Sequence, residues 1–169
     1  MKILWLDLNS SYAHSSLALP ALHAQVKEDT DMEWEIVSAT INENIGMIVD
    51  EIYRHQPDII AATCWLFNHE ALMHITSRVK ALLPHACLIL GGPEFLGENE
   101  SFLRRNPFVD CVFRGEGEEE FPRWLKVWNQ PEKQLVDFLP IMRQRLRRRG
   151  HLQAFVSIVR QILINHGGD

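Results

Sequence analysis

The chain has 169 residues and a formal net charge of −5; 46% of its residues are hydrophobic and 23% are charged. This composition is typical of a globular domain and excludes collagen-like, disordered and disulfide-scaffold proteins. No apolar run approaches the roughly 18 residues of a membrane span, and Asp7 interrupts the first run, so neither a transmembrane helix nor a signal peptide is predicted. The cysteines Cys64, Cys87 and Cys111 have no paired spacing, which favours a reducing cytoplasm.

Charge divides the chain into two parts. Residues 1–138 carry 11 basic and 21 acidic residues, a net of −10, whereas residues 139–169 carry six basic and one acidic, a net of +5. We expect an α/β domain over residues 1–130 and a basic linker with a helical tail over residues 131–169. Two interpretations of the tail stay open: a truncated or frame-shifted product, or a basic amphipathic helix that contacts nucleic acid or an anionic surface. The acidic body argues against nucleic acid as a partner.

Short apolar runs alternate with helical periodicity along the first part of the chain. The predicted strands are residues 2–8, 34–38, 59–64, 87–90 and 109–113, and the predicted helices are residues 16–27, 45–55, 69–83, 98–105 and 118–128. This alternation implies right-handed crossovers and a five-stranded, doubly wound parallel sheet of order 2-1-3-4-5, a flavodoxin-like or Rossmann-like α/β fold. The C-terminal tail adds helix only.

Four loops are predicted at the edge of the sheet where such folds bind ligands, outside the carboxyl ends of the strands. They are residues 9–15, 63–68, 91–98 and 114–117. The pair Gly91-Gly92 either lets the backbone lie against a flat ligand or forms a tight turn. The last of these loops, residues 114–117, does not match the glycine-rich motif that binds a dinucleotide, because the acids that open the next helix would repel a pyrophosphate.

Single side chains in these loops each have a structural alternative. Trp65 and Phe67 either line an apolar ligand site or pack under the next helix. We interpret Cys64 as a buried small hydrophobe rather than a nucleophile. His14 is a candidate ligand of a metal or a substrate, but no clustered Cys/His spacing predicts a structural zinc. A phospho-receiver domain is excluded because no aspartate ends the third predicted strand.

Taken together, the loop motifs resemble a known family. They are Asn9-Ser10-Ser11-Tyr12-Ala13-His14-Ser15-Ser16-Leu17-Ala18-Leu19-Pro20, Gln56-Pro57-Asp58-Ile59-Ile60, Leu90-Gly91-Gly92-Pro93-Glu94, Val109-Asp110 and Arg114-Gly115-Glu116-Gly117-Glu118. Over residues 1–130 the chain resembles the N-terminal cobalamin-binding domain of cobalamin-dependent radical SAM enzymes, in the branch with an Asn-x-x-Tyr-x-His-x-x-Leu-Ala start.

The resemblance implies cobalamin as cofactor and a set of contact residues. Residues 9–14 would face the lower side of the corrin, and Thr63 would offer a hydroxyl to the nucleotide tail. Gly91-Gly92 would let that tail pass between strands and helices, and residues 114–117 would shape the far side of the groove. The implied cofactor-binding residues are Asn9, Ser10, Ser11, Tyr12, His14, Thr63, Cys64, Trp65, Leu66, Gly91, Gly92, Pro93, Glu94, Arg114, Gly115, Glu116 and Gly117.

Two features of related proteins are missing from the sequence. The Asp-x-His-x-x-Gly motif of methionine-synthase-like proteins is absent, which leaves His14 as a candidate lower axial ligand. The cysteines lie 23 and 24 residues apart and cannot form the Cys-x-x-x-Cys-x-x-Cys loop that holds an iron–sulfur cluster. We therefore expect a module that is non-catalytic alone, without a cluster, and that serves a radical SAM catalytic domain. The alternatives are a degenerate domain acting through protein contacts without cofactor and, more weakly, a small hydrolase or transferase.

Overall fold

The computed structural model describes residues 1–26, 32–115 and 117–128 of the chain. The chain divides into two compact units, residues 1–122 and residues 123–169. Of the second unit, residues 123–128 are described, and there the rings of Trp124 and Trp128 stack with centroids 5.1 Å apart. The tail predicted over residues 131–169 lies outside the described residues.

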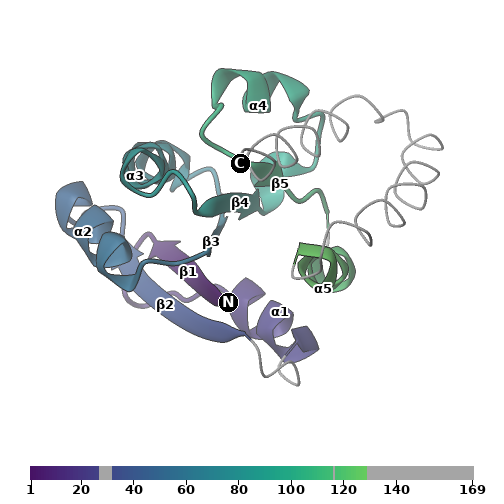
Figure 1. Cartoon of the computed structure of the whole chain (residues 1–169). Coiled ribbons are helices and arrows are strands. Elements are labelled where there is room, and N and C mark those ends of the chain that lie inside the picture. Colours follow the sequence, from purple (N-terminus) through teal and green to yellow (C-terminus); the bar gives the residue numbers. More distant parts are fainter. Residues whose placement is uncertain (27–31, 116, 129–169) are drawn as a thin grey trace, which may run out of the picture. The chain divides into compact units, whose positions relative to one another are not determined.

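The first unit is built on a parallel sheet of five strands in the order β2-β1-β3-β4-β5 (Figure 1). The strands are β1 (Lys2–Asn9), β2 (Glu33–Thr40), β3 (Ile59–Thr63), β4 (Cys87–Gly91) and β5 (Cys111–Val112). The helices are α1 (Ala18–Val26), α2 (Ile45–His55), α3 (His69–Leu82), α4 (Glu100–Arg105) and α5 (Gly117–Trp128), with the 3₁₀ helix η1 (Pro93–Phe95). This confirms the predicted flavodoxin-like topology and strand order.

One face of the sheet packs against α2 and α3 and forms the main core (Figure 1). Side chains alternate along the strands, so every second residue of β1, β3 and β4 points to this face. Its buried residues include Leu4, Leu6, Leu8, Ile60, Ala62, Leu88 and Leu90 from the strands, and Ile48, Val49, Ile52, Leu72, Ile75 and Val79 from the two helices. None of the described helices is long and apolar enough to cross a bilayer.

The opposite face carries the other half of each strand and is covered by α1 and the start of α5. Trp5, Ala61 and Ile89 lie side by side across β1, β3 and β4 on this face. Leu22 of α1 and Phe121 of α5 are buried, and the ring of Phe121 contacts Phe113 at a centroid distance of 5.8 Å. This second layer contains the candidate site.

The last strand is shorter than the predicted range of residues 109–113, and Asp110 accounts for its later start. Its carboxylate accepts hydrogen bonds from the backbone N–H of Leu88, at 2.7 Å, and from Nζ of Lys80, at 2.6 Å. Regular strand pairing therefore begins only at Cys111, which lies beside Ile89 of β4.

Candidate ligand-binding site

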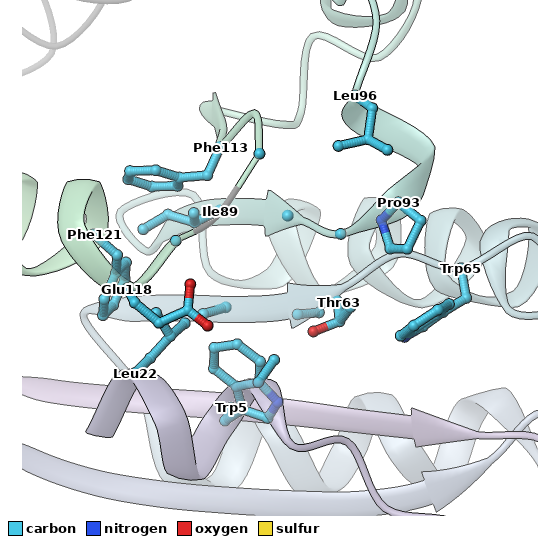
Figure 2. Close-up of a pocket in the computed structure, with 17 residues that line it drawn as sticks. Trp5, Leu22, Thr63, Trp65, Ile89, Pro93, Leu96, Phe113, Glu118 and Phe121 are labelled. Atoms are coloured by element: carbon cyan, nitrogen blue, oxygen red, sulfur yellow. The ribbon is translucent and has the colours of Figure 1, made fainter. Parts of the chain in front are cut away.

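A slot of about 490 Å³ opens between the sheet and the layer formed by α1 and the start of α5 (Figure 2). Pockets of this size accommodate small organic ligands. Of the described residues that line the slot, Glu118 alone is charged. The lining residues are Trp5, Ala18, Leu22, Ala61, Ala62, Thr63, Trp65, Ile89, Gly91, Gly92, Pro93, Leu96, Phe113, Gly115, Gly117, Glu118 and Phe121.

The floor of the slot is formed by two cross-strand rows of the sheet. Trp5, Ala61 and Ile89 form the deeper row, and Thr63 and Gly91 lie two residues further along their strands, toward the carboxyl edge. In Figure 2 Trp65 and Pro93 lie at the end toward which the strands point, whereas Leu22 and Phe121 lie at the other end. The slot therefore runs inward from the carboxyl edge along one face of the sheet.

Gly91 leaves the floor of the slot open. A Cβ built on Gly91 would have Phe113 Cβ, at 3.9 Å, and the carbonyl oxygen of Phe113, at 4.0 Å, as its nearest neighbours. These are ordinary van der Waals contacts, so the space above this backbone is unfilled by the chain itself. An inserted ligand could therefore lie directly on the backbone of β4.

Gly92 has a different role, because its backbone is in a conformation that only glycine adopts readily. Its φ is 110° and its ψ is −177°, and a Cβ here would lie 2.6 Å from the carbonyl oxygen of Cys64. The N–H of Cys64 donates to the carbonyl oxygen of Gly91 at 2.7 Å. Gly92 thus lets the chain leaving β4 pass close to the chain leaving β3. This point lies at the mouth of the slot, the end that Trp65 and Pro93 border (Figure 2).

Asn68 joins the carboxyl ends of two strands and was not predicted as a site residue. The side chain is 1% exposed, and its Nδ2 donates to the carbonyl oxygens of Leu8, at 2.9 Å, and Thr63, at 3.1 Å. Its Oδ1 accepts from the N–H of Trp65 at 2.8 Å. An asparagine at the start of a helix resembles a simple cap in sequence, so this bridging role was not visible there.

Removing this amide should cost stability. Asn68→Ala would leave three backbone groups without their partner, and we expect the free energy of unfolding in urea to fall by about 2–3 kcal/mol. Asn106→Ala is the matched control: the part-buried Nδ2 of Asn106 donates to the carbonyl oxygen of Phe102 at 2.9 Å, and about 1 kcal/mol is expected. Equal losses for the two variants would contradict the bridging role.

Trp65 and Phe67 form an aromatic pair at the mouth rather than packing beneath α3. Their rings are nearly parallel, at an interplanar angle of 16° with centroids 6.3 Å apart, and the side chains are 41% and 46% exposed. Leu66 between them is 83% exposed. Three exposed apolar residues in a row provide a surface for a flat apolar group or a protein partner.

Cys64 is a buried residue, as interpreted from the sequence. It is fully inaccessible, and burial raises the pKa of its thiol to about 12, so the thiol is neutral at physiological pH. Its Sγ lies 3.7 Å from Nδ1 of His69, which in turn lies 3.9 Å from Oε2 of Glu94. In the part of the chain that the structure describes, no three His, Cys, Asp or Glu side chains are grouped to hold a metal ion.

The loop after β1 lies outside the slot lining. Ser11 Oγ and His14 Nδ1 are hydrogen-bonded at 3.0 Å, and both residues are exposed or nearly so. Tyr12 is 78% exposed, and its hydrogen bond to the Glu43 carboxylate raises the pKa of the phenol. Asn9 is the last residue of β1, and Ser10 is the first residue of this loop.

The predicted residues therefore separate into groups. Thr63, Trp65, Gly91, Gly92, Pro93, Gly115 and Gly117 line the slot. Asn9, Ser10, Ser11, Tyr12, His14, Cys64, Leu66, Glu94 and Arg114 do not line it, and Glu116 lies outside the described residues. Sequence reasoning missed the deeper floor (Trp5, Ala61 and Ile89), although these residues share the strand face of Thr63 and Gly91 by simple alternation.

A family model described as the B12 binding domain matches residues 6–125. Over 66 residues the chain is 32% identical to the cobalamin-dependent radical SAM methyltransferase TokK of Streptomyces tokunonensis, a segment that covers 39% of this chain and 10% of that protein. The chain thus matches only about a tenth of that relative's length.

Solved structures that share the fold include the two described next. A cobalamin-binding protein from Desulfitobacterium hafniense DCB-2 matches with a TM-score of 0.52 at 18% identity, over 73% of this chain and 58% of that one. The cobalamin-dependent S-adenosylmethionine radical enzyme OxsB matches with a TM-score of 0.57 at 15% identity, over 74% of this chain and 18% of that one.

Proposed function

This chain belongs to the B12-binding domain family, and from that membership we propose that it binds cobalamin by taking the nucleotide tail of the cofactor into its slot. One observation carries the proposal: an apolar slot begins at the carboxyl edge of the sheet and runs over a backbone left bare at Gly91. A planar base attached to a ribose needs a narrow apolar space of this kind. The described residues therefore fit the group.

The residues at the mouth have separate proposed roles. Thr63 provides a hydroxyl to the tail as it enters, and Gly91 provides bare backbone beneath it. The exposed rings of Trp65 and Phe67 offer an apolar wall to the corrin, while the loop of residues 9–14 offers polar groups to its amide side chains. Cobalamin, when bound, supplies a cobalt centre suited to methyl transfer or radical chemistry.

We propose that this domain does not catalyse a reaction by itself. Cys64 is the first residue after β3, and Cys87 and Cys111 begin two other strands. The three thiols therefore do not form a loop that could hold an iron–sulfur cluster. The chemistry would come from a radical SAM catalytic domain, and this domain would position the corrin against it.

Purified protein mixed with hydroxocobalamin and then desalted should retain corrin absorbance in the visible spectrum, close to one equivalent per chain. Cobinamide, which lacks the nucleotide tail, should be retained at least tenfold more weakly, because it cannot fill the slot. A colourless protein after desalting would reject the proposal and favour a domain that acts through protein contacts at the exposed residues 65–67. Equal retention of both corrinoids would show that the corrin binds outside the slot and that the nucleotide tail does not enter it.

A further inference from the structure

The indole of Trp5 is an unpartnered donor in the floor of the slot. The residue is 4% exposed, and its buried Nε1–H has no hydrogen-bond partner among the described residues. An indole nitrogen can only donate, and buried tryptophans usually find an acceptor. The same ring lines the slot (Figure 2). The missing acceptor is therefore expected on a molecule that occupies the slot, toward which the indole would turn, because Nε1 itself has almost no exposed surface without a ligand.

The position of Trp5 decides which part of that molecule reaches it. Trp5 lies in the row of Ala61 and Ile89, whereas Thr63 and Gly91 lie two residues nearer the carboxyl edge. Two residues of a parallel strand advance about 6.6 Å. A ligand that enters past Thr63 and Gly91 therefore presents its far end to the indole.

The lining around Trp5 selects an uncharged far end. The described lining contains no cation, and its one charged side chain is the carboxylate of Glu118, which would repel a phosphate. Leu22, Ile89 and Phe121 offer apolar contacts instead. A heteroaromatic ring with an acceptor nitrogen in its plane satisfies both the apolar walls and the indole donor.

We infer that Trp5 recognises the lower base of the cobamide, its Nε1–H donating a hydrogen bond to a ring nitrogen of that base. The inference rests on the proposed cobalamin binding and specifies which cobamides the slot prefers. The base is the terminal group of the nucleotide tail, and its ring nitrogen is free to accept only when it does not ligate the cobalt. Trp5 is thus a specificity-determining residue for cobamides whose base has such a nitrogen.

Trp5→Phe tests this inference, since it removes the N–H and keeps an aromatic ring. Dissociation constants are measured by visible-absorbance titration for cobalamin, whose benzimidazole has the acceptor nitrogen, and for a phenolyl cobamide, whose base has none. We expect Trp5→Phe to weaken cobalamin about fivefold to tenfold and the phenolyl cobamide less than twofold. Comparing each variant with wild type for the same ligand cancels the cost of detaching the base from cobalt.

Trp34→Phe is the matched control. The Trp34 ring contacts His23 and Phe121, at centroid distances of 5.1 and 6.1 Å, and is not part of the slot lining. It should leave both affinities within twofold. A second measurement needs no substitution: the Trp5 indole ¹H–¹⁵N resonance of wild-type protein should shift strongly with cobalamin and much less with the phenolyl cobamide.

The possible failures are distinguishable. Wild-type protein that binds no corrinoid would reject the proposed function itself. Wild-type protein that binds cobalamin, with equal losses or no loss for the two ligands in Trp5→Phe, would overturn the role of Trp5 and leave cobalamin binding intact. An indole resonance that shifts equally with both ligands would overturn it as well, even where Trp5→Phe fails to fold.

Discussion

Gly91→Leu is expected to abolish cobalamin retention, with an affinity loss of at least 100-fold, while the fold stays intact. The new side chain would project from the slot floor beside Phe113, into the space that the chain leaves open. A nucleotide tail and a leucine cannot both occupy that space, because filled interiors tolerate little excess volume. The visible spectrum after desalting measures the result.

Stability should not follow affinity in this variant. Gly91 is the last residue of β4, and its backbone does not have the positive φ that would exclude a side chain. Glycine within a strand costs roughly 0.5–1 kcal/mol relative to alanine, so the free energy of unfolding should stay the same or rise slightly.

A size series makes the test specific to the slot. Gly91→Ala, Gly91→Val and Gly91→Leu should lose affinity in that order, while their urea midpoints remain close to wild type. Affinity that is independent of side-chain size, or full retention by Gly91→Leu, would place the tail elsewhere. A parallel fall in stability along the series would show that the lost binding reflects unfolding.

The sheet was predictable because its order follows from the alternation of strands and helices alone. The helix at residues 45–55 has the predicted bounds, since Asn44 caps it through Gly46 N–H and Pro57 follows its end. The start of the last strand was predicted too early, because the Asp110 carboxylate accepts a hydrogen bond from the backbone N–H of Leu88. That long-range contact leaves no local pattern in the sequence.

The mouth of the site was predictable, but its interior was not. Glycines and aromatic residues mark the loops at the carboxyl edge in the sequence, as Gly91 and Trp65 do. Trp5 and Ala61 belong to apolar strand segments, and such residues look the same whether a helix or a ligand covers them. Only the packing of α1 and the start of α5 shows that this cover is incomplete.

The role of the loop at residues 9–14 is still a prediction. Tyr12 and His14 are exposed, and neither lines the slot. The lower face of a corrin lies outside the slot when its tail lies inside, so an exposed position agrees with the predicted contact. The slot and this loop would then hold different parts of one cofactor.

Gly92→Ala is expected to lower the free energy of unfolding by about 3 kcal/mol or more. The pair φ 110°, ψ −177° belongs to a region that is essentially restricted to glycine, and an L-residue there costs about 1–3 kcal/mol. The added Cβ would also lie 2.6 Å from the Cys64 carbonyl oxygen and 2.8 Å from Cγ2 of Thr63. Relieving these contacts requires the ends of β3 and β4 to separate.

Such a separation would strain the hydrogen bond from the Cys64 N–H to the Gly91 carbonyl oxygen, 2.7 Å long. Gly97→Ala in the same loop is the control, since a Cβ there meets no atom within 4 Å, and its stability should stay within about 0.5 kcal/mol of wild type. Urea unfolding of both variants measures the difference, and similar small losses would contradict the structural role of Gly92. Gly92 shapes the turn, so a side chain there should lower the free energy of unfolding. Gly91 leaves the slot open, so a side chain there should weaken cobalamin binding instead.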